Sequence, residues 1–242
     1  MQPGVAQRYL RQIALPEIGP DGQQRINDAT VAIAAEGDDL AAEVAARYLA
    51  AAGVGRVRLI GGAGAAEPAF ADALRASNPD VVVDARAWPD GGQAWLAALD
   101  GADLVVRAGF DDDPMLRATV RLGIPAVLLR ALDDRVELLA VREQGPCPHV
   151  DLAIPPRRAP GASAGATAVV AATLGASEAL WLLVRRDGAR GPDARPRRKN
   201  APARHLSLSL SPDGGAPRVQ EIPWTPECFA CGGGSVEMVL SS

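Results

Sequence analysis

Short apolar runs alternate with helical segments over the first half of the chain, and this alternation constrains the fold more than any other feature. Thr30–Ala35 and Arg56–Ile60 have the length and apolar content of buried strands. Between them, Leu40–Ala52 is rich in alanine and is followed by Gly53, a residue typical of helix ends. This strand–helix–strand order predicts the α/β class, a Rossmann-like, mostly parallel sheet flanked by helices.

The pattern continues to the end of the chain. Further strands are predicted at Val81–Ala85, Asp103–Val106, Ala126–Leu129 and Arg135–Val141, and an antiparallel hairpin at His205–Leu210 and Val219–Ile222. Helices are predicted at Pro68–Ser77, Gly92–Leu99, Pro114–Leu122 and Ala164–Arg185. We expect 1–242 to form one domain, with a helical arm over 1–28, a turn at Gly19–Gly22, an exposed loop over 186–204 and a hairpin with a tail over 205–242.

Composition argues against several classes of function. The net charge of −4 does not suit a general nucleic-acid binder. No apolar stretch of about 18 residues is free of charge, which argues against a membrane span. Met1–Gly4 lead straight into Arg8–Gln12, so we expect no signal peptide, and the cysteine count of three is odd. Both features predict a reduced, cytoplasmic setting.

Four stretches resemble, in the same order along the chain, parts of the ThiF/MoeB/HesA family. Arg8–Ile13 is similar to the N-terminal arm of the family, and Tyr48–Gly55 to the end of its first helix. Gly145–Cys147 with Cys228–Gly232 resemble the two halves of its zinc knuckle, and Ala172–Ala179 its last long helix. Members of this family activate C-terminal carboxylates of ubiquitin-like carrier proteins as acyl-adenylates. The resemblance therefore implies a Rossmann-like fold, a dimer and adenylyltransferase chemistry.

The turn after the first strand departs from the family pattern. In the family a glycine-rich turn lets backbone N–H groups approach the phosphates of the nucleotide. Here the turn keeps one glycine, Gly37, and carries the carboxylates of Glu36, Asp38 and Asp39. Because like charges repel, we expect this turn to bind phosphate poorly.

The cations and the metal ligand of the family are also reduced. The loop Gly61–Glu67 holds no Asp, Asn, Arg or Lys, and the single lysine of the chain is Lys199. Asp111 matches the metal-binding aspartate of the family if the loop shifts by one residue; the alternative is an acidic turn that caps the helix beginning at Pro114. Arg107 is the best remaining candidate for a substitute cation. We therefore expect ATP and Mg²⁺ to bind weakly or not at all.

A zinc site is the second expectation from the resemblance. Cys147, His149, Cys228 and Cys231 would form a Cys₃His tetrahedron, a ligand set that Zn²⁺ accepts. The first pair is spaced more tightly than in the family, so a decayed site with buried or free thiols is the alternative. All three cysteines stand at these positions, and Pro156–Gly165 has none for the thiol chemistry of the sulfur-transferring members.

Two functions remain open. In family members an arginine of the arm crosses a dimer interface to the nucleotide of the partner, and Arg11 matches it. The leading hypothesis is a non-catalytic, partner-binding protein: the inactive half of a heterodimer with Arg11 acting in trans, or a homodimer in which Arg11 pairs with a carboxylate. A small carrier protein or a peptide is a further expected partner, and nucleic acid and membranes are not. The alternative is a divergent ATP-dependent adenylyltransferase that uses arginines in place of lysine.

Overall fold

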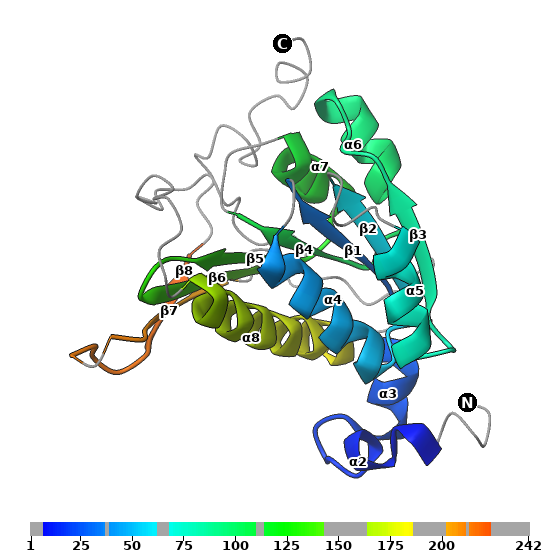
Figure 1. Cartoon of the computed structure of the whole chain (residues 1–242), viewed down its shortest axis with the longest axis horizontal. Helices are drawn as coiled ribbons and strands as arrows, with labels where there is room; N and C mark the ends of the chain where they lie inside the picture. The colour runs from blue at the N-terminus through cyan, green and yellow to red at the C-terminus, as the bar shows by residue number, and fades with distance from the viewer. Residues whose placement is uncertain are drawn as a thin grey trace.

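The structure, a computed structural model, describes residues 7–36, 39–61, 68–109, 114–142, 164–185, 202–211 and 213–223. Its centre is a twisted sheet with the strand order β3-β2-β1-β4-β5-β6-β7-β8 (Figure 1). The five strands β1 (Thr30–Ala35), β2 (Arg56–Gly61), β3 (Val82–Arg86), β4 (Leu104–Ala108) and β5 (Ala126–Ala131) are parallel. The predicted Rossmann-like fold is confirmed.

Three antiparallel strands extend this sheet beyond β5. They are β6 (Arg135–Val141), β7 (Ala203–Ser209) and β8 (Arg218–Ile222), and each pairs with the strand before it. β7 and β8 form the predicted C-terminal hairpin, which lies at the far end of the sheet from β3 (Figure 1).

Helices cover both faces of the sheet, as the alternation of strands and helices requires. One face packs against α4 (Leu40–Ala52), α5 (Pro68–Ser77) and α8 (Ala164–Val184), and the other against α6 (Gly91–Leu99) and α7 (Pro114–Leu122). Figure 1 shows α4 and α8 side by side across the first face. Helices bury the parallel strands from both sides, and the central strands β1 and β4 therefore consist mostly of apolar residues.

The helix α8 is predominantly apolar and carries a single charged residue, Glu178. Gly165–Val184 is long and apolar enough to cross a membrane by length and composition, although half of it is buried inside the protein. Core helices pass the same test, and α8 packs against α4, β5 and β6. At Gly175 the approach to β5 is so close that an added Cβ would lie 2.1 Å from Leu129 Cδ2.

The N-terminal arm contains two helices and docks on one end of the body. They are α2 (Leu10–Ile13) and α3 (Gly19–Asp28). The predicted turn at Gly19–Gly22 is wrong, because these residues form the first turn of α3. Pro20 stands where a helix needs no N–H donor, and Asp21 in the first turn complements the helix dipole. Arg25 of α3 donates a hydrogen bond to the Val184 carbonyl at 2.6 Å, which caps the C-terminus of α8.

Candidate functional site

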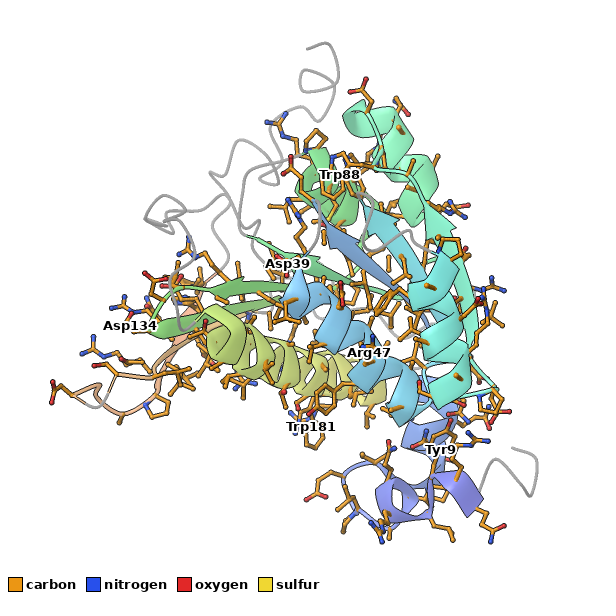
Figure 2. All side chains as sticks on the ribbon, viewed as in Figure 1. Tyr9, Asp39, Arg47, Trp88, Asp134 and Trp181 are labelled. Carbon is orange, nitrogen blue, oxygen red and sulfur yellow. The ribbon has the colours of Figure 1, made fainter. Side chains whose placement is uncertain are left out.

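The carboxyl ends of the parallel strands meet around β1 and β4, the point at which the strand order reverses. In open α/β sheets this edge is the usual ligand site. β1 pairs with β2 on one side and with β4 on the other, so Glu36 and the start of α4 lie beside the end of β4. Figure 2 shows Asp39 at the start of α4, next to this edge.

The carboxylate of Asp39 occupies the N-terminus of α4. Its Oδ1 accepts hydrogen bonds from the backbone N–H of Ala41 at 2.9 Å and of Ala42 at 3.1 Å. Asp39 has an extended backbone and is the N-cap residue of the helix. These N–H groups are the donors that a helix N-terminus would offer to a bound phosphate. The exposed Glu36 adds a second carboxylate at the end of β1.

Arg107 lies on β4 and is directed into the protein. Its side chain is only 2% exposed, and its guanidinium lies 4.9 Å from the centre of the Trp88 ring. The Nη1 group of Arg107 also donates to the carbonyl of Ala108 at 2.7 Å. Trp88 in turn meets Trp95 edge to face, with ring centres 4.9 Å apart. The indole face and the carbonyl stabilise the buried charge on the α6/α7 side of the sheet.

A second buried arginine lies one strand further along the same edge. Arg130 of β5 is opposite Glu137 of β6, and Arg130 Nε donates to Glu137 Oε2 at 2.9 Å. The register places Leu128 opposite Arg107. Arg130 lies two residues after Leu128 and therefore on the same face of the strand, so Arg130 and Arg107 project from the same face of the sheet. His205 on β7 lies near this pair, and its pKa is lowered by burial and by Arg130, against the opposing effect of Glu137.

The predicted site residues fall into two groups. Arg11 lies on α2 and is exposed, and Arg107 is buried as described above. Gly37, Asp111, Cys147, His149, Cys228 and Cys231 lie outside the described residues, so the zinc and magnesium sites stay predictions. Within the residues that the structure does describe, no three His, Cys, Asp or Glu side chains gather as metal ligands would.

Sequence reasoning did not find the partners of Arg107 and Arg130. Arg130 and Glu137 are charged residues inside apolar strand runs, and this was an available signal because a charge in such a run needs a partner. Trp88 follows β3 in a segment without periodicity, so nothing in the sequence connected it with Arg107.

Comparison with known proteins adds a short match in sequence and a long one in structure. No protein-family model matches the chain. A sulfur carrier protein adenylyltransferase of Thermus thermophilus is 47% identical over 53 residues, which is 22% of this chain and 19% of that protein. The vegetative HesA protein of Trichormus variabilis is 48% identical over 56 residues, 23% of this chain and 20% of that protein. Each match therefore spans about a fifth of the curated relative.

Solved structures match over almost the whole chain. The crystal structure of E. coli MccB with MccA-N7isoASN has a TM-score of 0.71 and 16% identity, covering 93% of this chain and 74% of that one. PaaA has a TM-score of 0.68 and 16% identity, covering 93% of this chain and 76% of that one. At this identity the likeness concerns the fold, and it defines the chain as a Rossmann-like α/β protein with an MccB-like sheet.

The resemblance predicted from the sequence is confirmed: the chain shares its fold and a stretch of sequence with proteins of the ThiF/MoeB/HesA family. It is thus similar to adenylyltransferases of that family.

Proposed function

We propose that this chain is a non-catalytic, partner-binding member of the ThiF/MoeB/HesA family, with the adenylation site closed by its own carboxylate. The observation that carries this proposal is the pair of hydrogen bonds from Ala41 and Ala42 to Asp39. A phosphate at this helix end would have to displace Asp39 and would then lie beside two carboxylates, with Glu36 as the second.

The position of Arg107 supports the same proposal. Adenylation develops charge on the α-phosphorus and the leaving pyrophosphate, and fixed cations must stabilise that charge. Arg107 is held by Trp88 and Ala108 on the α6/α7 side of the sheet, whereas α4 covers the opposite face. The partner of such a chain would be a second copy, another family member, or a small carrier protein or peptide. Structures of MccB with the peptide MccA are among its neighbours in fold.

A second candidate function is a divergent ATP-dependent adenylyltransferase that activates a carrier protein or a peptide. The observation in its favour is the 47% identical segment shared with the sulfur carrier protein adenylyltransferase. In that case Arg107 would have to leave Trp88 to reach the nucleotide.

Nucleotide titration separates the two. We expect calorimetry to detect no binding of Mg²⁺-ATP to the chain, and inorganic pyrophosphate to leave its melting temperature unchanged. Asp39→Ser keeps a capping oxygen but removes the charge, so this variant should gain a measurable shift with pyrophosphate. Asp90→Ser is the matched control, because Asp90 is the N-cap residue of α6 and its side chain makes no capping hydrogen bond.

Pyrophosphate exchange tests the reaction itself. Carrier-dependent exchange of labelled pyrophosphate into ATP by this chain alone, lost in Arg107→Ala, would overturn the proposal and establish the enzyme. Exchange that requires a second family member and falls in Arg11→Ala would support the inactive-half form of the proposal, because exposed Arg11 would then act on the nucleotide of the partner.

A further inference from the structure

The edge of the sheet formed by β8 is exposed. β8 is the last strand in the described part of the chain, and it pairs only with β7 there. Four of its five residues are exposed, and the fifth, Ile222, is half-buried. The outer side of an edge strand presents backbone N–H and C=O groups that can pair with another strand.

An apolar row leads across the sheet to this edge. Leu138 of β6 is opposite Leu206 of β7, which is opposite Val219 of β8. The row faces α8, because Leu138 belongs to the core cluster that contains α8 and Leu206 packs against that cluster. Leu138 is 4% exposed, whereas Val219 is 55% exposed. The helix therefore covers the inner end of the row and leaves the outer end open.

A groove lies between the open end of this row and α8. Its volume is about 230 Å³, and Leu174, Ser177 and Trp181 of α8 form the wall opposite the row. This is below the roughly 300–1,000 Å³ of typical small-molecule sites, so the groove suits an apolar side chain better than a cofactor. Glu178 of α8 and Arg204 of β7 also line the groove and form an ion pair of 3.1 Å. In Figure 1, α8 runs alongside β6 to β8 at this end of the sheet.

The charges on β8 define which strand would fit. Arg218 directly precedes the row position Val219, and Glu221 lies two residues after it. Because side chains alternate between the two faces of a strand, Glu221 projects from the same face as Val219 and Arg218 from the opposite face. Opposite charges on directly paired residues stabilise a sheet, and like charges destabilise it. An added strand should therefore carry an acidic residue opposite Arg218, an apolar residue opposite Val219 and a basic residue opposite Glu221.

We propose that β8 and this groove bind an extended peptide segment of a partner protein as an additional antiparallel strand. Read from its N-terminus, the segment has the pattern basic–any–apolar–acidic, and its apolar side chain extends the row of Leu138, Leu206 and Val219 into the groove beside Trp181. An antiparallel orientation continues the alternation of β6, β7 and β8. The inference rests on the partner-binding part of the proposed function and needs no nucleotide.

The test uses the full chain and a fluorescent peptide, Thr-Thr-Lys-Thr-Leu-Glu-Thr, followed by anisotropy without nucleotide. We expect saturable binding that weakens at least tenfold in Val219→Asn and at least tenfold when the peptide leucine is replaced by asparagine. Val82→Asn is the matched control, because Val82 is an exposed valine (46%) on the opposite edge strand, β3. The affinity of the Val82→Asn variant for the peptide should equal that of the unmodified protein.

A charge exchange tests the register. The double variant Arg218→Glu/Glu221→Arg should prefer the peptide in which lysine and glutamate are exchanged, by at least as much as the unmodified protein prefers the original. This reversal cannot arise from misfolding, because a damaged edge would bind both peptides poorly.

Three results would overturn the proposal: no saturable binding, equal binding by Val219→Asn and Val82→Asn, or an unchanged preference after the charge exchange. Concentration-dependent self-association that Val219→Asn abolishes, without peptide binding, would also overturn it and assign the edge to a second copy. Pyrophosphate exchange by the chain alone would contradict the proposed non-catalytic function and leave the peptide result standing, so the two failures are distinguishable.

Discussion

Asn78 donates a hydrogen bond from Nδ2 to the hydroxyl of Tyr9 at 2.8 Å and thereby joins the arm to the end of α5. The same Nδ2 group donates to the carbonyl of Ala50 on α4 at 2.7 Å. The Tyr9 ring lies over Gly53, where an added Cβ would be 2.6 Å from the ring (Figure 2 labels Tyr9). Tyr9 is thus fixed to the body, while Arg11, two residues further, remains exposed on α2.

Substitution of Asn78 should loosen this junction. Asn78→Ala removes both donated hydrogen bonds and the acceptor of the Asp80 N–H at 3.1 Å. With about 1 kcal/mol for each buried bond, we expect the free energy of unfolding to fall by about 2–3 kcal/mol. Tyr9→Phe removes one bond and should cost about 1 kcal/mol. Urea denaturation of both variants and of the double variant measures this, and fully additive losses would show that the two residues do not interact.

The second prediction concerns the closest approach of α8 to the sheet. Gly175→Ala places a Cβ within 2.1 Å of Leu129 Cδ2, and Leu129 is only 1% exposed. Overpacking of this kind costs about 1–3 kcal/mol. Adding Leu129→Ala removes the obstructing methyl groups, so the double variant should lose less stability than the sum of the single losses. Thermal unfolding of the three variants checks this, and simple additivity would contradict the contact.

The buried ion pair between β5 and β6 gives a third prediction. The side chains of Arg130 and Glu137 are 9% and 8% exposed, so Glu137→Ala leaves a guanidinium in a poorly solvated place. Such a loss costs about 3–5 kcal/mol, whereas an apolar pair at the same positions is often tolerated. Glu178→Ala is the control, because its partner Arg204 is 44% exposed and exposed pairs contribute about 0–1 kcal/mol. Equal losses in the free energy of unfolding of Glu137→Ala and Glu178→Ala, measured by chemical denaturation, would contradict the predicted difference between the buried and the exposed ion pair.

The fourth prediction is a pH dependence at His205. Burial lowers its pKa below the ordinary value, so the folded protein prefers the neutral ring. The stability from this preference is present above the ordinary pKa and is lost as the pH falls through the lowered one. Between about pH 7.5 and 5, His205→Gln should therefore lose less stability than the unmodified protein. Parallel pH–stability curves for the two proteins would exclude a role of His205.

Helices whose ends are marked by a glycine or a proline were predictable from the sequence alone. Leu40–Ala52 and Pro114–Leu122 agree to the residue with α4 and α7, because Gly53 and Pro114 mark their boundaries through backbone geometry. The strand β5 extends beyond the predicted Leu129 to Ala131, since Arg130 can stay in the strand only with Glu137 opposite it. That pairing is non-local and is invisible in a single run of residues.

The candidate site was predictable in composition but not in geometry. The sequence shows the carboxylates of Glu36, Asp38 and Asp39, and it favours aspartate at a helix start. Which carboxylate turns toward the helix depends on the backbone of one residue, and the structure identifies Asp39. Arg107 packs against Trp88, which lies in the connection after β3. No local sequence pattern around Arg107 encodes this contact.

The hydrogen bonds between Asp39 and α4 have a consequence for how this protein responds to its surroundings. A phosphate held by a helix N-terminus comes and goes with its concentration, but a carboxylate carried on the same chain stays at a fixed effective concentration. In the proposed non-catalytic function, Asp39 keeps the donors of Ala41 and Ala42 satisfied at any nucleotide level. On that proposal, a partner that recognises this end of the sheet would meet the same surface when ATP is abundant and when it is depleted.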